Sequence, residues 1–465
     1  MAARAPQVGL LPLYLELYDK SSPKLRERHE AFLGTIAGEL EKRGLDVVPA
    51  EFCRLQPEFA AAVKKFEDAG ADAIVTLHMA YSPSLESAEV LANTNLPLIV
   101  LDTTPTFAFG PEQSPGEIAY NHGIHGVQDM CNLLIRNGKA FQIEAGHWEQ
   151  SDVLDRVAAW GRAAGMGGAM RNARVGRIGE AFAGMGDFAV PPETLERTLG
   201  VTTVPVEPAV IRELLPEPDA DAVRAEMARN LADFASADLD EEANRRAARA
   251  CLAVRAWLEQ EQLTAFSMNF LAIDKASGLG AVPFLEASRA MARGIGYAGE
   301  GDVLTAAVVG ALLSVFPEST FTEIFCPDWQ GDSLFLSHMG ELNLQLIDGQ
   351  PKLIERPWPY TDAEGPLVVV GRLKAGEAVL VNLSPGPGDT FSLLVAPGEM
   401  LGADGEDKFA NSVRGWFKPK GAVADFLADY SRAGGTHHSA LVYGTEADTI
   451  MRFGQLMGWK TVIVS

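Results

Sequence analysis

Residues 73–101, AIVTLHMAYSPSLESAEVLANTNLPLIVL, contain two apolar runs that flank one helical segment. The runs Ala73–His78 and Leu96–Leu101 are rich in β-branched and leucine residues, as expected of strands buried on both faces. The segment between them, Leu85–Asn93, has helical spacing and ends at an asparagine. Two buried strands joined through a helix form a βαβ unit, in which the strands run parallel. This stretch therefore predicts a parallel sheet covered by helices.

The alternation of strand-like and helical segments continues on both sides of this stretch. On the N-terminal side it includes an apolar run, a helical segment and an extended segment, at Val8–Leu17, Pro23–Arg43 and Leu45–Phe52. A second series begins near Arg174 and includes Val201–Val206, Glu241–Gln262, Thr264–Phe270 and Phe284–Arg293. The sequence thus predicts two α/β domains, at residues 1–170 and 171–318, each built on a parallel sheet.

The pattern changes after Pro317, where short strand candidates alternate with clusters of glycine, proline and aspartate. Three of these candidates are Leu367–Val370, Ala378–Val381 and Phe391–Val395. Regular short strands separated by turn residues are typical of an antiparallel sheet or barrel. The predicted fold class is therefore α/β: two parallel-sheet α/β domains followed by a C-terminal domain, residues 319–465, with an antiparallel β-barrel.

The chain is strongly acidic. Its 465 residues include 39 Lys and Arg against 62 Asp and Glu, which gives a formal charge of −23. Binding of nucleic acid requires clustered cations that displace counterions, so no nucleic-acid partner is expected. Pro12 interrupts the first apolar run, and the most apolar segment, Val303–Phe316, is shorter than the roughly 20 residues that cross a bilayer. We expect a cytoplasmic protein without a membrane partner.

Three further features are expected to carry no special chemistry. The four cysteines form no CxxC pair, which indicates reduced thiols and argues against a cysteine-based zinc site. His29 lies among charged residues in a helical segment and is expected at the surface. The acidic segment Leu214–Glu242 is expected to form mostly exposed helix and loops, because runs of charge are usually solvated.

The segment Gly294-Ile-Gly-Tyr-Ala-Gly299 matches the pattern GxGxxG, but its context does not suit a dinucleotide site. A dinucleotide motif follows a strand and opens a helix, whereas this one follows a helical segment. Its continuation, Gly299-Glu-Gly-Asp302, places an acidic residue between glycines directly before an apolar helix. Asp302 suits the N-cap of that helix, which leaves Glu300 without a structural explanation.

Other side chains capable of chemistry lie far apart in the sequence. Glu323 lies in the apolar stretch Phe321–Cys326, where a buried carboxylate needs a partner or a metal, although on an edge strand it would face solvent. His338 could be a hydrogen-bonded core histidine, whereas the glycines before His437 and His438 let two imidazoles approach a ligand closely. Two carboxylates and one or two imidazoles without a thiolate suit Mn²⁺, Mg²⁺, Co²⁺ or Fe²⁺.

These motifs together resemble one family, the L-arabinose isomerases within the wider L-fucose/L-arabinose isomerase group. The resemblance rests on Gly296-Tyr-Ala-Gly-Glu-Gly-Asp302 and on Gly434-Gly-Thr-His-His438. Supporting segments follow the family order from about residue 70 to 445: Asn121-His-Gly-Ile-His-Gly126, Gly146-His-Trp148, Ala265-Phe-Ser-Met-Asn-Phe270, Leu336-Ser-His-Met339 and Trp416-Phe-Lys-Pro419. The family fold has two α/β domains and a C-terminal domain with a β-barrel, in agreement with the prediction from periodicity.

The resemblance also implies roles for particular residues. Glu300, Glu323, His338 and His438 would hold the metal, with Mn²⁺ the usual ion, and Glu300 and Glu323 would also be the catalytic acid/base pair. The substrate contacts, to which we add two histidines of the same motifs and strand ends, would be His125, Phe270, His437 and His78.

The implied activity is aldose–ketose isomerisation of a small sugar through an enediol intermediate. This reaction needs a positioned base, because the C2 proton is hardly acidic, and a cation that stabilises the developing negative charge. Family members assemble as trimers paired into hexamers, in which the N-terminal domain of an adjacent subunit closes the pocket. We therefore expect a homo-oligomer in which His125, His78 and Asp102 face the metal of a neighbour.

The sequence departs from the family where the substrate is contacted. The family's glutamine followed by Leu-Tyr-Gly is not evident in residues 9–18, and Leu101-Asp-Thr-Thr104 stands where the family has a polar His-Thr-Gln. The segment Ile324-Phe-Cys-Pro-Asp-Trp329 replaces a stretch rich in aspartate and tyrosine. The sugar is therefore open. Alternatives are an isomerase or epimerase of a deoxy, branched or hexose sugar, another metal-dependent enzyme, and a non-catalytic sugar-binding protein on the same scaffold.

Overall fold

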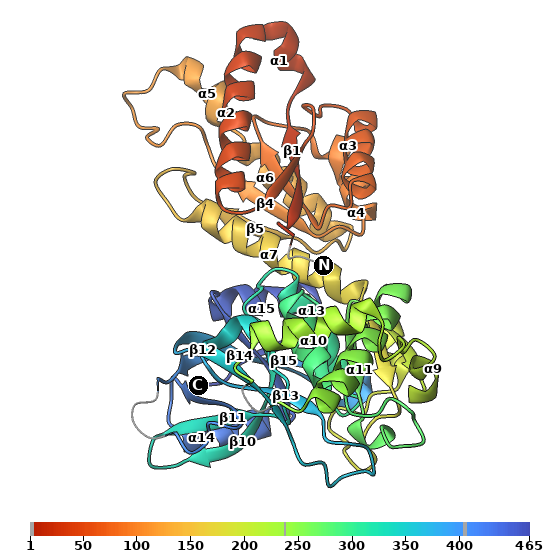
Figure 1. Cartoon of the computed structure of the whole chain (residues 1–465). Coiled ribbons are helices and arrows are strands. Elements are labelled where there is room, and N and C mark those ends of the chain that lie inside the picture. The colour runs from red at the N-terminus through yellow and green to blue at the C-terminus, as the bar shows by residue number, and fades with distance from the viewer. Residues whose placement is uncertain (1–3, 237–238, 403–406) are drawn as a thin grey trace. The chain divides into compact units, whose positions relative to one another are not determined.

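The computed structural model describes residues 4–236, 239–402 and 407–465 and divides into two compact units (Figure 1). The N-terminal unit comprises Arg4–Gly167, and the second unit Gly168–Ser465. The further division of the second unit into domains at residues 171–318 and 319–465 stays a prediction. Among the described helices, none combines the length and the apolar composition that crossing a bilayer requires.

The N-terminal unit is a parallel sheet covered by helices. Its strands are β1 (Gln7–Leu13), β2 (Asp46–Pro49), β3 (Ala73–His78), β4 (Leu98–Asp102) and β5 (Gln142–Ala145). They lie in the order β2-β1-β3-β4-β5, and every pairing is parallel. The helices are α1 (Glu16–Ser21), α2 (Pro23–Lys42), α3 (Gln56–Asp68), α4 (Ser84–Asn93), α5 (Ile118–Asn121), α6 (Ile124–Arg136) and α7 (Val153–Arg171), which runs on into the second unit. Apolar residues of α3, α4 and α6 pack against the sheet, with α2 and α3 on opposite sides of it (Figure 1).

The carboxyl ends of three neighbouring strands meet at one edge of this sheet. Leu13 of β1 lies beside His78 of β3 in the parallel register, and β4 ends next to them at Asp102. Strand β3 has the bounds predicted from periodicity, Ala73–His78. In parallel sheets ligands bind beyond this edge, so the unit presents its polar side chains where a binding surface is expected.

His29 is buried, which corrects the expectation of a surface residue. On α2 it shares a buried face with Leu25 and Phe32, four residues before it and three after it, while its charged neighbours in sequence lie on other faces of the helix. Its ring lies 5.5 Å from the ring of Tyr14 in an edge contact. Burial, together with the nearby charge of Arg28, lowers the pKa of His29 to about 4.

The second unit begins with another parallel sheet. Its strands β6 (Arg174–Ile178), β7 (Thr202–Val206), β8 (Ala265–Met268) and β9 (Gly296–Gly299) lie in the order β7-β6-β8-β9. Strand β9 contains Gly296 and Gly299 of the glycine motif, so this part of the motif is a sheet strand rather than a phosphate-binding turn. The helices of this part are α8 (Pro192–Leu199), α9 (Pro208–Arg212), α10 (Asp221–Asp233), α11 (Glu241–Gln260), α12 (Phe284–Ala292) and α13 (Val303–Leu313).

The C-terminal part of the second unit is a closed antiparallel barrel. Its six strands are β10 (Ser319–Asp328), β11 (Ser333–Ser337), β14 (Gly376–Pro385), β15 (Phe391–Met400), β16 (Val413–Pro419) and β17 (His438–Tyr443). The order is β16-β11-β10-β17-β14-β15, and pairing of β15 with β16 closes the ring. Strands β12 (Ile347–Glu355), β13 (Leu367–Leu373) and β18 (Lys460–Ile463) and helices α14 (Val423–Arg432) and α15 (Ala447–Leu456) complete it. The predicted α/β class with a C-terminal β-barrel is confirmed.

Helix α13 joins the two layers of this unit. It packs on β8 and β9 and also contacts β10 and β17 of the barrel, and its residues Val303 to Leu313 are buried almost without exception. The helix lies so close to β9 that a Cβ at Gly296 would be 2.3 Å from the carbonyl oxygen of Ala306. The most apolar segment of the chain is therefore a core helix, and its N-terminus lies where the sheet meets the barrel.

The acidic segment before α11 is only partly solvated. Glu226 on α10 is buried and pairs with Arg255 of α11 at 2.7 Å and with the fully buried Arg289 of α12. Arg255 also bonds Glu286 at 2.6 Å. Part of this negative charge thus serves an internal ion network, because a buried guanidinium must be paired. Among the described residues the four cysteines are free thiols, as predicted.

Candidate metal centre

The carboxyl end of β9 presents Glu300 in a strained backbone conformation. Its φ is +64°, a left-handed value that non-glycine residues rarely adopt and that is typical of functional sites. The backbone is held from both sides, since the Glu300 nitrogen donates to the Met268 carbonyl at 2.8 Å and its carbonyl accepts from the Phe182 nitrogen at 2.9 Å. The preceding Gly299 lets an imidazole approach, because a Cβ there would lie 2.7 Å from the His338 ring.

The barrel register brings the other predicted ligands together. Glu323 on β10 pairs with Ser337 of β11 on one side and with His438, the first residue of β17, on the other. His338 directly follows Ser337, so its side chain lies within reach of the same carboxylate. Antiparallel pairing therefore assembles into one cluster three residues that lie far apart in the sequence.

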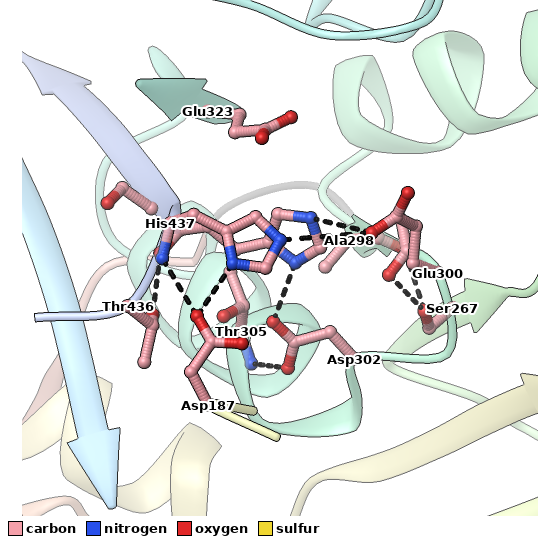
Figure 2. A network of polar contacts seen from close by, with 12 residues as sticks. Asp187, Ser267, Ala298, Glu300, Asp302, Thr305, Glu323, Thr436 and His437 are labelled. Carbon is pink, nitrogen blue, oxygen red and sulfur yellow. Dashed lines mark hydrogen bonds and ion pairs between the residues drawn. The ribbon is translucent and has the colours of Figure 1, made fainter. Parts of the chain in front are cut away.

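In three imidazoles of this cluster, Nδ1 lies against a carboxylate. His338 Nδ1 lies 2.9 Å from Glu341 Oε2, and His438 Nδ1 lies 3.0 Å from Asp302 Oδ2. His437 Nδ1 lies 2.6 Å from Asp187, on the side away from Glu300 (Figure 2). A carboxylate beside Nδ1 orients each ring, so that Nε2 faces the opposite side.

The Nε2 atoms and the glutamate oxygens are spaced as ligands of one cation. His338 Nε2 lies 3.8 Å from Glu323, and His438 Nε2 lies 3.6 Å from Glu300. These separations exceed a hydrogen bond of about 2.7–3.2 Å, but they fit two atoms that each bind a metal at roughly 2.1 Å. His438 Nε2 is buried without a hydrogen-bond partner among the described residues. The donors are nitrogen and oxygen only, which suits a divalent cation such as Mn²⁺.

Two overlapping groups of donors meet these criteria. One consists of Glu323, His338 and His438, and the other of Glu300, His437 and His438, each with its donor atoms within 4.8 Å of one another. His438 belongs to both groups. All four predicted metal ligands are therefore in this cluster, together with His437.

The two glutamates differ in proton affinity. Burial raises the pKa of Glu323, and the nearby histidines offset this only in part. Burial acts on Glu300 in the same direction, but contact with His437 and the electrostatic effect of the nearby histidines outweigh it, so the pKa of Glu300 is lowered. Contacts with Glu300 and then Asp187 raise the pKa of His437 to about 9. With no cation bound, Glu300 therefore holds negative charge more readily than Glu323.

Aromatic rings enclose the imidazoles and extend beyond them. Phe321 contacts His338 and His438 edge-on at 4.8 and 5.0 Å, and Phe188 stacks on His438 at 4.9 Å with an angle of 12° between the rings. The predicted pocket residue Phe270 belongs to a separate aromatic cluster, whose other members lie 5.4–5.8 Å from its ring and are Phe182, Trp358 and Tyr360.

The predicted substrate contacts His78 and His125 belong to the N-terminal unit. His78 is buried against Gly126 of α6, and burial lowers its pKa to about 3. His125 is exposed on α6, with its ring 5.5 Å from that of His122. Both lie near the carboxyl edge of the parallel sheet, because β3 ends at His78 and the amino end of α6 packs on it.

The carboxylates behind the imidazoles are not predicted as site residues from the sequence. Glu341 follows His338 by three residues, a spacing that could have been noticed. Asp302 was expected only as an N-cap, and it performs that function through Thr305 while also holding His438. Asp187 lies 250 residues before His437, and no local pattern points to it.

Comparison with known proteins finds two matching family models. The model of the L-arabinose isomerase central domain matches residues 219–316, and the model of the L-arabinose isomerase C-terminal domain matches residues 318–460. Together they cover more than half of the chain. The fold, the cluster and these matches define the protein as a sugar isomerase of the aldose–ketose class.

More particularly, the chain belongs to the L-arabinose isomerase family. The L-arabinose isomerase of Geobacillus kaustophilus is 26% identical over 370 residues, which cover 74% of this chain and 71% of that protein. The L-arabinose isomerase of a Nocardioides species is 26% identical over 357 residues, with 74% and 70% covered. L-arabinose isomerase 1 of Bacillus licheniformis is 24% identical over 433 residues, with 89% and 86% covered.

Proposed function

We propose that the protein is a metal-dependent isomerase that interconverts an aldose and a ketose through an enediol intermediate. The observation that carries the proposal is the convergence of Glu300, Glu323 and the Nε2 atoms of His338 and His438 at separations too long for hydrogen bonds. The buried, unpartnered His438 Nε2 supports it, because such an atom costs free energy unless something binds it.

The four residues would hold one divalent cation, with Mn²⁺ as the proposed ion and Mg²⁺, Co²⁺ or Fe²⁺ also suited to the donors. A cation bound there stabilises the negative charge that develops on the two substrate oxygens. Glu341 and Asp302 keep the imidazoles oriented for this task.

Glu300 and Glu323 form the proposed acid/base pair. One carboxylate removes the proton from C2 of the aldose and returns it to C1, while the other assists the transfer of a proton from O2 to O1. The two groups come from opposite layers, one from the end of β9 and one from β10, so they can flank a substrate. A protein that only bound a sugar would not need a carboxylate beside the carbon that loses its proton.

The proposed substrate contacts come from both units. Phe270 and His437 belong to the unit that contains the metal centre, and His125 and His78 belong to the N-terminal unit. The family resemblance supports a cytoplasmic homo-oligomer, a trimer or hexamer, in which the N-terminal unit of a neighbour closes the pocket. Light scattering coupled to size-exclusion chromatography tests the assembly, and full activity of a dilute monomer contradicts it.

The proposed substrate is a small sugar, either L-arabinose or another pentose, deoxy sugar or hexose. Residues 9–18 and 101–104 differ from the family's sugar-contacting segments. The proposal is therefore tested with several sugars rather than with one. Each segment includes the carboxyl end of a strand of the N-terminal sheet, β1 in the first and β4 in the second.

The test is an NMR assay in D₂O on Mn²⁺-loaded and EDTA-treated protein, with L-arabinose, L-fucose, D-galactose and their ketoses. Ketose formation that requires the metal and introduces solvent deuterium supports the isomerase and its enediol route. Metal-dependent ketose formation without deuterium replaces the enediol route with a hydride shift. No conversion of any sugar by protein that binds Mn²⁺ contradicts the proposed activity on this panel.

A further inference from the structure

We propose that Tyr297 is a positioning residue of the isomerase, which holds Glu341 in place behind the imidazole of His338. The inference rests on the proposed metal-dependent function and goes beyond it, because Tyr297 is not among the ligands, the acid/base pair or the substrate contacts. Tyr297 belongs to the motif Gly296-Tyr-Ala-Gly-Glu-Gly-Asp302, in which both carboxylates have a role and the tyrosine has none.

The first argument is the hydrogen bond of the Tyr297 hydroxyl. This hydroxyl donates to Glu341 Oε1 at 2.8 Å, and Glu341 Oε2 lies 2.9 Å from His338 Nδ1. Each oxygen of the carboxylate therefore has a different partner, and the two contacts together fix the rotation of the carboxylate group. Tyr297 and Glu341 are fully buried, so bulk water cannot replace a missing donor. The direction of the His338 ring thus depends, through Glu341, on the Tyr297 hydroxyl.

The second argument is the face of β9 on which Tyr297 lies. Residues 297 and 299 of one strand point to the same side of the sheet. At the second of these positions Gly299 leaves room for the His338 ring, because a Cβ there would lie 2.7 Å from it. At the first, the tyrosine reaches Glu341, which follows His338 by three residues. One face of this strand therefore accommodates both members of the His338–Glu341 pair.

The third argument is that the Tyr297 ring supports the same imidazole by a second route. It lies 5.8 Å from the ring of Phe321 in an edge contact. Phe321 in turn lies 4.8 Å from His338 and 5.0 Å from His438. The ring of Phe266, on the neighbouring strand β8, lies 5.0 Å from the Tyr297 ring. These contacts hold the tyrosine ring in the core, so its hydroxyl is kept at Glu341.

The hydroxyl retains its proton at neutral pH. Burial, and after it the negative charge of Glu341, raises the pKa of Tyr297 well above its ordinary value. Tyr297 is therefore a donor to Glu341 and takes no part in the proton transfers proposed for Glu300 and Glu323.

The experiment measures Mn²⁺ binding by calorimetric titration of metal-free protein. Tyr297→Phe removes the donor and keeps the ring. The matched control is Tyr443→Phe, which removes the hydroxyl of another buried tyrosine, one that donates to the Lys374 carbonyl at 2.7 Å. We expect Tyr297→Phe to weaken Mn²⁺ binding about 10-fold, the lower end of the 10- to 100-fold loss that follows removal of a partner behind a ligand, because Glu341 itself remains. The control is expected to stay within twofold of the unaltered protein.

Two further measurements separate positioning from a purely structural role. In a double-mutant cycle with Glu341→Gln, the effect of Tyr297→Phe on Mn²⁺ affinity is expected to be at least threefold smaller than in the unaltered protein, because the carboxylate through which it acts is already lost. The electron paramagnetic resonance spectrum at saturating Mn²⁺ reports the arrangement of the ligands rather than the affinity. We expect this spectrum to change in Tyr297→Phe and to stay the same in Tyr443→Phe.

Three results overturn the inference. The first is that Tyr297→Phe binds Mn²⁺ within twofold of the unaltered protein or gives an identical resonance spectrum. The second is an equal effect of Tyr297→Phe with and without Glu341→Gln. The third is a Tyr297→Phe protein that does not fold while the control folds, because Tyr297 is then a residue of the core alone. Failure of the unaltered protein to bind Mn²⁺ contradicts the proposed function itself, and is thus distinguishable from failure of this inference.

Discussion

Asp302 offers a test that separates the stability of the fold from the chemistry of the centre. Its carboxylate is fully buried and performs two functions, since Oδ1 accepts from the Thr305 nitrogen at 2.9 Å to cap α13 and Oδ2 lies 3.0 Å from His438 Nδ1. In Asp302→Asn the amide oxygen keeps the cap, because asparagine caps helices as well as aspartate does. The amide NH₂ then faces the protonated Nδ1 of His438, so two donors oppose each other.

In Asp302→Asn the proton on His438 has two possible positions, and both weaken the binding of Mn²⁺. If His438 keeps its proton on Nδ1, a buried donor pair is unsatisfied, at a cost of about 1–3 kcal/mol. If the proton moves to Nε2, the lone pair that faces Glu300 is lost. In either case we expect Mn²⁺ binding to weaken 10- to 100-fold, or about 1.4–2.7 kcal/mol. Asp302→Ala is expected to lose the cap as well, which adds about 1 kcal/mol to the loss of stability.

The assay combines calorimetric titration with Mn²⁺ and denaturant unfolding in EDTA. The expected result is that Asp302→Asn and Asp302→Ala share the loss of metal affinity, while the alanine variant shows the additional loss of a cap in its metal-free stability. Mn²⁺ affinity of Asp302→Asn within twofold of the unaltered protein would refute the reasoning, because it would mean that the proton on His438 does not govern metal binding.

Four further outcomes are expected. Glu300→Gln and Glu323→Gln should each lower kcat by at least 10²-fold with an unchanged circular dichroism spectrum, and an active variant removes that residue from the acid/base pair. Mn²⁺ at 100 times its Kd should raise the free energy of unfolding by about 2.7 kcal/mol, an increase that EDTA abolishes; an unchanged melting temperature contradicts a metal site. Burial holds the pKa of His29 at about 4 against 6.5 for an unburied histidine. Below pH 6.5 the unfolded chain therefore binds a proton at His29 that the native state does not bind. The free energy of unfolding should fall by up to about 3 kcal/mol as the pH drops toward 4. His29→Phe should flatten this slope in chemical unfolding measured at pH 5 and 7, and an unaltered slope means that His29 is not its source. Arg289→Ala should lower the free energy of unfolding in urea by about 1.5–3 kcal/mol, because Glu226 loses one buried guanidinium partner and keeps Arg255; a loss below 1 kcal/mol shows that the contact with Arg289 is dispensable.

Much of the fold could be predicted because burial repeats with the geometry of each element. The apolar run Ala73–His78 is β3 without a change of bounds, and the helical spacing of Pro23–Arg43 is α2 to within one residue. The prediction of a surface position for His29 is wrong, because it rests on the adjacent charges and not on the residues that share its helix face. A residue's environment in a helix is set by positions three and four away, and those positions, Leu25 and Phe32, were apolar.

The candidate site could be predicted only where a local motif contains side chains that bind a metal or transfer a proton. An acidic residue between two glycines, and two histidines after two glycines, are unusual enough to single out Glu300, His437 and His438. The structure explains the glycines around Glu300: a Cβ at Gly299 would lie 2.7 Å from the His338 ring, and Gly301 has a left-handed φ of +81°. The preference of aspartate for the N-cap position is enough to predict Asp302 at the N-terminus of α13.

Local sequence patterns are thus enough to predict most strands and helices, the α/β class, the helix cap at Asp302 and the kinds of donor atom in the site. Which carboxylate meets which imidazole depends on the packing of distant segments. The barrel register sets Glu323 beside His438, and the loop after β6 places Asp187, which lies 250 residues earlier in the chain, against His437. The physical reason is that periodicity reports which face of an element is buried, because that face recurs with the element's own geometry. It contains no information about which distant segment covers the face, and the pairing of buried charges depends on that segment.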